Sequence, residues 1–202
     1  MNTWRIFASV FMICLLAGCN STPIKPLIYT PATELGTKQT SLEKNFKVGN
    51  FADKRTDKEL DVLFEATAIE EIERVLEESL SQNANSFGQQ YTITGSLYQL
   101  EWEIPDYEAM IRKVFAASLL TGGLGGAAYG TTSTQVFSRI DIEYDVRDPS
   151  GSTIFTKRYK IEHEEIRKKL DSDTPGAKSE IASQALSKSI NLFLTDLSKQ
   201  SL

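Results

Sequence analysis

Residues 140 to 147 alternate without interruption between apolar and charged side chains. The apolar positions are Ile140, Ile142, Tyr144 and Val146. Such alternation is typical of a β-strand with one face buried and the other in water. The turn-forming sequence Asp148-Pro149-Ser150-Gly151 follows, and the segment 153–163 then carries Lys157, Arg158 and Lys160. The pattern therefore predicts an antiparallel hairpin, with these basic residues facing the acids of the first strand.

A strand and a long helix are predicted before this hairpin. The strand covers residues 46–51 and ends in a cluster of polar, turn-forming residues at 52–57. Between Leu60 and Gln82 apolar residues recur at helical spacing, and glutamates lie mainly on the other faces. We expect an amphipathic helix there, and its acidic face is most simply a solvated one.

A second strand and a final helix complete the predicted elements. Alternation from Tyr91 changes phase near Tyr98 and continues to Ile104, which indicates a strand with a β-bulge. Near the end of the chain, Thr174 is a helix-capping residue and Pro175 suits the first helical position. The apolar stripe of that helix consists of Ile181, Ala185, Leu186, Ile190, Phe193, Leu194 and Leu197.

The predicted fold class is α+β. The order of elements is β-α-β-(hydrophobic insertion)-β-β-α, which favours a sandwich with the helices packed on one face of a mixed or antiparallel sheet. We expect one such domain over residues 46–202, with a glycine-rich hydrophobic insertion at 107–138.

The first nineteen residues resemble a bacterial lipoprotein export signal. Arg5 precedes an apolar run from Ile6 to Leu16, and the sequence Leu16-Ala17-Gly18-Cys19 follows. A charged start, a short apolar core and small residues before the cut are typical of a cleaved signal peptide, here residues 1–18. The cysteine at the cut is the residue that lipoproteins acylate. We therefore expect lipid, palmitate included, on Cys19, and several acyl chains would anchor the protein firmly.

The remainder of the sequence limits what the mature protein can do. Residues 19–45 carry three prolines among polar residues, which favours an extended tether. Cys14 leaves with the signal and Cys19 is acylated, so no thiol remains for a disulfide, a metal or catalysis. Loss of Arg5 from a chain of net charge −5 leaves −6, and no basic cluster is present. Nucleic acid is not an expected partner.

The insertion has no charged residue between Lys113 and Arg139, and Gly122, Gly126 and Gly130 recur at every fourth position. In lipid this spacing lets helices approach closely, so one interpretation is a helix over 114–130 that contacts membrane or another copy through a glycine zipper. The alternative is a helix over 107–120 that covers the sheet, followed by a glycine loop. A hairpin for an oligomeric barrel is less favoured, because the segment lacks strict alternation.

No catalytic or metal-binding motif is evident. His163 is the only histidine, and His163-Glu164-Glu165 lacks the second histidine of a zinc-protease helix, so we expect an exposed side chain. Glu101 and Glu103 flank Trp102 at a spacing that a glycosidase could use, but the distance alone is weak evidence. The run 123–128 loosely matches a dinucleotide fingerprint without the strand that should precede it. We expect no enzyme activity, no cofactor beyond the lipid on Cys19, and no nucleotide partner.

Several short motifs resemble those of known lipoproteins. They are Val48-Gly49-Asn50-Phe51-Ala52-Asp53-Lys54-Arg55 at the end of the first strand, Thr94-Gly95-Ser96 in the second, and the 148–151 turn. With the lipobox and tether, the order of elements from Phe46 to Leu197 is similar to a broad group of small outer-membrane lipoproteins. The group includes YajG-like lipoproteins, penicillin-binding-protein activator lipoproteins and the curli secretion channel lipoprotein.

The resemblance implies the α+β fold, the outer membrane and no catalytic residues. In the curli channel the corresponding insertion forms part of a membrane barrel; here the segment 114–130 lacks alternation, and no second matching insertion is evident. Asn20 also favours sorting to the outer membrane. We expect a periplasm-facing accessory or assembly factor of an envelope complex, in contact with membrane lipid and with an unidentified envelope protein or itself. The alternatives are a cell-wall synthase regulator and a pore-forming or secretion subunit.

Overall fold

The computed structural model describes residues 44–63, 67–81, 90–105, 107–122, 124, 132–172 and 174–200. The predicted signal peptide, Cys19 and the tether up to residue 43 lie outside the described residues. In chain order the elements are β1 (Asn45–Asp53), the 3-10 helix η1 (Glu59–Leu63), α2 (Ala68–Ser81), β2 (Gln90–Glu103), α3 (Tyr107–Leu120), β3 (Ser133–Arg147), β4 (Thr153–Lys168), α5 (Lys169–Ser172) and α6 (Pro175–Ser198).

The strands form one mixed sheet in the order β1-β2-β3-β4. β1 and β2 are parallel, because the chain crosses back through α2 between them, whereas β2-β3 and β3-β4 are antiparallel. The predicted bulge in β2 is confirmed: the register passes from Leu97 opposite Ile142 to Gln99 opposite Asp141, which leaves Tyr98 without a partner in the β2-β3 register.

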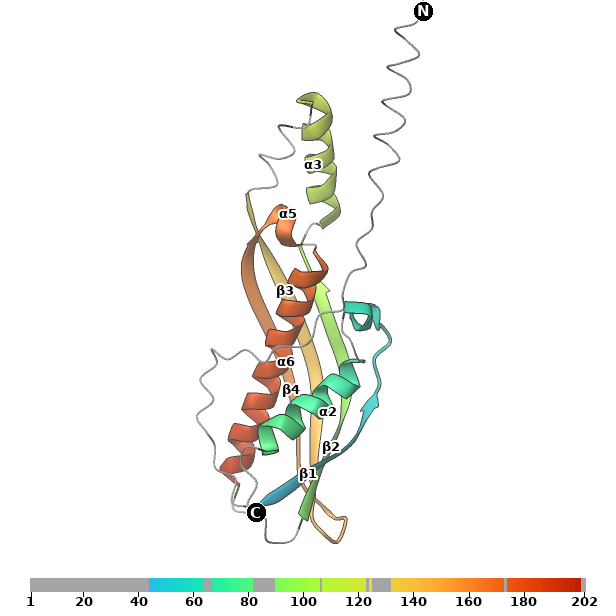
Figure 1. Ribbon diagram of the computed structural model, residues 1–202, viewed down its shortest axis with the longest axis vertical. Helices are drawn as coiled ribbons and strands as arrows, with labels where there is room; N and C mark the ends of the chain where they lie inside the picture. The colour runs from blue at the N-terminus through green and yellow to red at the C-terminus, as the bar shows by residue number, and fades with distance from the viewer. Residues whose placement is uncertain are drawn as a thin grey trace, which may run out of the picture.

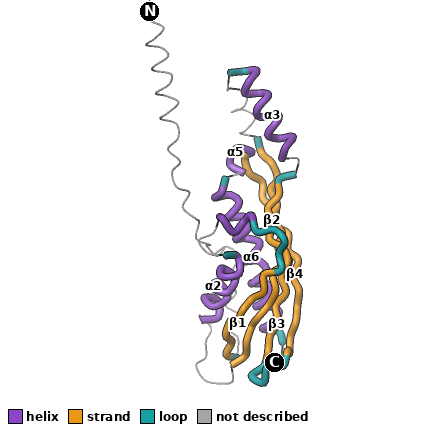
Figure 2. Tube along the Cα trace, turned by 90° about the vertical axis from the view of Figure 1, so that its right-hand side faces the viewer, coloured by secondary structure: helices purple, strands orange, loops and turns teal. Residues whose placement is uncertain are grey.

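The helices α2, α5 and α6 pack against one face of this sheet, as the fold-class prediction states. α2 contacts β1, and α6 runs along β3 and β4. Figure 1 shows both helices in front of the strands, and Figure 2, turned by 90°, shows the helices on one side and the opposite face of the sheet bare. The core lies between these layers and includes Ile72, Leu76, Ile93, Leu97, Ile142, Tyr144, Ile190 and Phe193.

The final helix begins where the sequence predicts. The hydroxyl of Thr174 accepts a hydrogen bond from the backbone N–H of Ala177 at 3.2 Å, and Pro175 occupies the first turn. Of its predicted apolar stripe, every residue is buried except Leu194, which is partly buried.

The predicted helix from Leu60 to Gln82 is wrong in its first third. The chain instead forms η1 and then starts α2 at Ala68. The reason is a capping box: Thr67 Oγ1 accepts from the N–H of Glu70, and the Glu70 carboxylate accepts from the N–H of Thr67 at 2.7 Å. Two backbone donors at the helix start are satisfied in this way, so the helix begins there.

The hairpin is longer than predicted, since β3 starts at Ser133 and β4 continues to Lys168. Arg158 and Lys160 bind Asp141 across it, as expected. Lys157 does not face the acids of β3. Its position in β4 points to the helix side of the sheet, and its ammonium lies 2.6 Å from Asp196 of α6.

A single helix over 114–130 is also wrong, because α3 ends at Leu120 and Gly122 then adopts φ +61°. A left-handed glycine after the last helical turn is a common helix stop. The alternative bounds of 107–120 are confirmed, but that helix does not cover the sheet. Both views show α3 beyond the end of the strands (Figures 1 and 2).

Candidate functional site

The α3 arm, defined as residues 107–122, has its described contacts with the domain at its base. Met110 is buried with Ile104, Val136 and Ile181 in a small cluster separate from the main core. The ring of Tyr107 also meets Trp102 edge to face, with 6.2 Å between centroids. This apolar base holds the first turn of the helix, and the later turns extend away from it.

The outer part of the arm exposes large apolar side chains. Phe115, Leu119 and Leu120 are 65%, 69% and 86% exposed. Of the nine large hydrophobic residues that are exposed in the described part of the chain, five lie between positions 111 and 124. Scattered exposed apolar residues are normal, but a concentration on one projecting element marks a contact site for membrane or protein.

These side chains do not form one narrow stripe. Ile111, Phe115 and Leu119 follow each other at every fourth position on one side of the helix. Leu120 lies about 140° around the axis from Phe115, since successive residues are about 100° apart. A groove in a partner protein would cover only one of these two sides of the helix, whereas lipid would contact both sides.

The charged residues of the arm lie in its first two turns, which we call its foot. Arg112 binds Glu108 at 3.0 Å, one turn away, and both side chains are well exposed. Lys113 is the last charged residue before Arg139 in the sequence. The arm thus has a polar, partly basic foot and an uncharged upper part.

The structure describes one of the predicted site residues. Cys19, Gly126 and Gly130 lie outside the described residues. Gly122 has open space where a Cβ would be, with no atom of the described residues within 4 Å, so its role in the described part of the chain is to end the helix. The sequence analysis selected the glycines and missed Ile111, Phe115 and Leu119, although their every-fourth spacing is a readable signal.

The two carboxylates considered for sugar chemistry do not enclose a substrate site. Glu103 is paired with Arg139, which also binds Glu162 at 2.6 Å. Glu101 borders a cavity of about 50 Å³ beside Trp102. That volume suits one or two water molecules and is too small for a sugar ring, and Glu103 does not line this cavity.

His163 is not the exposed residue that the sequence predicted. It lies in the interior of β4, its side chain is half-buried, and burial lowers its pKa below the usual value while nearby Glu165 acts in the opposite direction. Its register partner is Ser138, whose own register partner on β2 is Trp102. No group of three or more metal-ligating side chains occurs among the described residues.

No known protein family and no curated protein matches this chain. Among solved structures, it is similar to a protein described as a lipoprotein from Caulobacter crescentus CB15, with 9% identity and a TM-score of 0.38 over 79% of this chain and 89% of that one. It is also similar to a minor lipoprotein from Acinetobacter baumannii, with 12% identity and a TM-score of 0.38 over 75% and 90% of the two chains. At these values the likeness establishes neither a family nor an activity. Within the described residues no helix is both long and apolar enough to span a membrane.

Proposed function

We propose that this chain is a non-enzymatic, lipid-anchored protein of the bacterial envelope that acts as an accessory or assembly factor, and that its α3 arm inserts into the surface of a bilayer. The observation that carries the proposal is the exposed apolar upper part of the arm. Exposure of an apolar helix to water is unfavourable in free energy, and contact with lipid takes that apolar surface out of water.

Two features support lipid as the occupant. The exposed side chains lie on more than one side of α3, as Ile111, Phe115 and Leu120 show. Arg112 and Lys113 at the foot are suited to the phosphate level of a membrane, where long basic side chains extend toward headgroups. An acylated Cys19 would supply a first membrane contact and the arm a second, and two contacts make binding stable where one is marginal. In this proposal the membrane is the outer one, with the domain facing the periplasm.

The test places a fluorophore on the arm. In the lipidated protein, Phe115→Trp would be reconstituted into vesicles of phosphatidylethanolamine and phosphatidylglycerol whose acyl chains carry bromine. We expect strong quenching of the new tryptophan. The control is Val62→Trp, an equally exposed apolar position on η1, which should remain unquenched.

A second variant separates insertion from mere proximity to the bilayer. Adding Leu119→Glu to the Phe115→Trp protein puts a charge on the same side of the helix, one turn later, and should abolish the quenching. Because both side chains are exposed, the thermal unfolding midpoint should not change. An unquenched tryptophan at position 115 in the anchored protein would show that the arm does not enter lipid.

A further inference from the structure

β4 is a long edge strand. It runs from Thr153 to Lys168 at the end of the sheet order, and the described residues include no strand beyond it. α6 packs on one face of β4, so among the described elements nothing pairs with β4 in the plane of the sheet on its outer side. Edge strands of this length are templates for pairing with another chain unless their side chains oppose it.

Between residues 157 and 165 the charges of β4 are separated along the strand, and the basic Arg167 and Lys168 lie beyond this stretch. The basic residues Lys157, Arg158 and Lys160 lie before Ile161, and the acidic residues Glu162, Glu164 and Glu165 lie after it. An antiparallel second copy presents the same sequence in reverse. The basic half of one strand then faces the acidic half of the other.

We propose that two copies of this chain pair through their β4 edges, antiparallel, about a two-fold axis at Ile161. In this register Lys160 faces Glu162 of the second copy and Arg158 faces Glu164 on the bare face of the sheet. On the helix face, Lys157 faces Glu165 and Tyr159 faces His163. Every charged pair in the central part of the interface is attractive, and each occurs twice by symmetry.

The register is selective. Sliding each strand by one residue moves the axis to Lys160 or to Glu162, and that residue then faces its own copy with the same charge. One kind of attractive pair remains in each case, Arg158 with Glu162 or Lys160 with Glu164, against three kinds with the axis at Ile161. Like charges directly opposite one another are destabilising, so the neighbouring registers with the helices on the same face are disfavoured.

The charged groups next to the axis are accessible for this contact. Lys160 is 74% exposed although it binds Asp141 at 3.2 Å, and Glu162 is 52% exposed although it binds Arg139. In the pair, Lys160 would lie between Asp141 of its own β3 and Glu162 of the second copy, and Glu162 would lie between Arg139 and Lys160 of the second copy. These ion pairs would form one network across the interface. Networks of this kind contribute more than isolated surface pairs.

The pairing does not depend on the proposed membrane contact. It places the two α3 arms at opposite ends of the joined sheet, since each arm extends beyond one end of its strands (Figure 1). One arm of a pair would therefore meet the bilayer while the other points away from it, so in the dimer the quenching expected at position 115 applies to one arm of each pair.

The test uses two single charge reversals in the full lipidated chain, purified in detergent and measured by sedimentation velocity. Wild type should be a dimer. Lys160→Glu places Glu against Glu162 twice, and Glu162→Lys places Lys against Lys160 twice, so each variant alone should dimerise at least about tenfold more weakly. In an equal mixture, a dimer of one copy of each variant has the new Glu at position 160 facing the new Lys at position 162, and the native Glu162 facing the native Lys160. It should recover the dimer.

Lys47→Glu is the matched control, because it makes the same charge change on β1 at the other edge of the sheet. It should leave the dimer intact. A monomeric wild type would overturn the proposal, as would single reversals that leave the dimer unchanged. Failure of the mixture to dimerise would overturn the register. None of these readings depends on quenching at Phe115.

Cysteine cross-linking gives an independent reading of the register. Ile161 alone faces its own copy, at a Cα separation of about 4.5–5.5 Å that a disulfide can span. Ile161→Cys should form a disulfide-linked dimer under mild oxidation, whereas Ile154→Cys, which would face Lys168, should not. Equal cross-linking at the two positions would contradict the proposed axis.

Discussion

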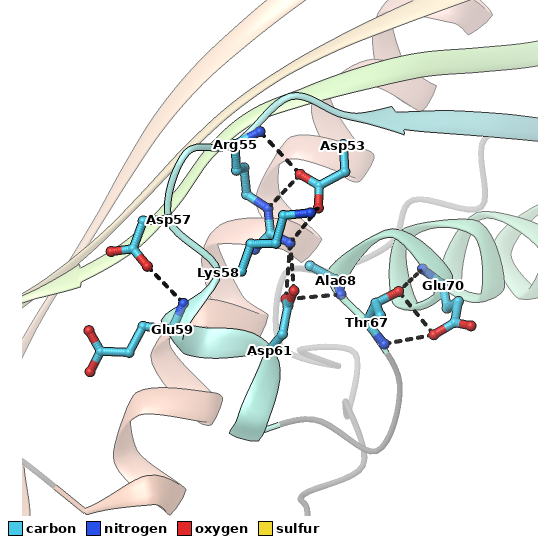
Figure 3. Close-up of polar contacts among 9 residues, drawn as sticks. All are labelled: Asp53, Arg55, Asp57, Lys58, Glu59, Asp61, Thr67, Ala68 and Glu70. Atoms are coloured by element: carbon cyan, nitrogen blue, oxygen red, sulfur yellow. Dashed lines mark hydrogen bonds and ion pairs between the residues drawn. The ribbon is translucent and has the colours of Figure 1, made fainter.

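The guanidinium of Arg55 lies 2.8 Å from the carboxylate of Asp61, and that carboxylate also accepts a hydrogen bond from the backbone N–H of Ala68 at 3.2 Å. Figure 3 shows the resulting connection, which joins the segment after β1 to η1 and to the first residue of α2. Asp53 binds the other side of the same guanidinium at 3.0 Å. The Arg55 side chain is only 1% exposed, so its charge is held by these two carboxylates.

Replacing Arg55 with alanine should strongly destabilise the fold. Removing one member of a buried ion cluster leaves uncompensated charge, and we expect a loss of about 3–5 kcal/mol in the free energy of unfolding. Urea denaturation followed by circular dichroism measures it. Arg112→Ala removes an exposed arginine from the arm and should change stability by less than about 0.5 kcal/mol. Equal effects at the two positions would contradict the role given to Arg55.

The same cluster predicts a loss of stability in acid. Burial alone would raise the pKa of Asp53, but hydrogen bonds from Arg55 and Lys58 outweigh it and hold that pKa well below the usual value of 3.8. Because the folded-state pKa is the lower one, this stabilisation is complete above pH about 4 and is lost as the pH falls further. Unfolding free energies measured by urea titration between pH 7 and 2 should show this decline.

Asp53→Asn is the variant that isolates this contribution. It should be less stable than wild type at pH 7 and should lose less stability between pH 4 and 2. Asp57→Asn alters a carboxylate of the same loop that binds the Glu59 N–H instead of Arg55, and it should keep the wild-type decline. A full decline in Asp53→Asn would assign the acid sensitivity to other carboxylates.

Local sequence signals predicted the hairpin and α6 because their determinants are local. Alternation fixes which side of β3 is buried, and Thr174 with Pro175 fixes the start of α6. The start of α2 also has a local signal, since Thr67-Ala68-Ile69-Glu70 is a capping box. The predicted helix began too early because apolar residues at helical spacing continue on the N-terminal side of that box.

The position of α3 and the surroundings of His163 could not be read in this way. An apolar helix can pack on a sheet or extend beyond it, and only the tertiary fold decides which. Likewise, the strand register brings Trp102, Ser138 and His163 into one row across the sheet. The indole Nε1, the hydroxyl Oγ and the imidazole Nε2 of these residues are buried and have no hydrogen-bond partner among the described residues. Their position follows from long-range pairing that no single segment encodes.

Gly95 should not tolerate a side chain. A Cβ there would lie 2.5 Å from the ring of Phe51 and in contact with the carbonyl oxygen of Glu143. Gly95→Ala should therefore cost about 2–3 kcal/mol through displacement of β2 or of the ring, measured by urea denaturation. Gly151→Ala is the comparison: its φ of +88° strains alanine but the space is open, so about 1 kcal/mol is expected. A smaller loss at Gly95 than at Gly151 would contradict the close approach.

Phe193 packs α6 against the centre of the sheet. Its ring stacks on Tyr144 of β3 with 4.3 Å between centroids and 12° between planes, and both side chains are fully buried. Tyr144 also shares a 3.1 Å hydrogen bond with Ser189, one turn earlier on α6. Phe193→Ala should lower the free energy of unfolding by about 3–5 kcal/mol, because it removes the apolar contacts and leaves a cavity against Tyr144. Urea denaturation gives the loss, and Leu192→Ala, at the exposed neighbouring position, should cost less than about 1 kcal/mol. If the two substitutions cost the same, α6 is not held to the sheet through this ring.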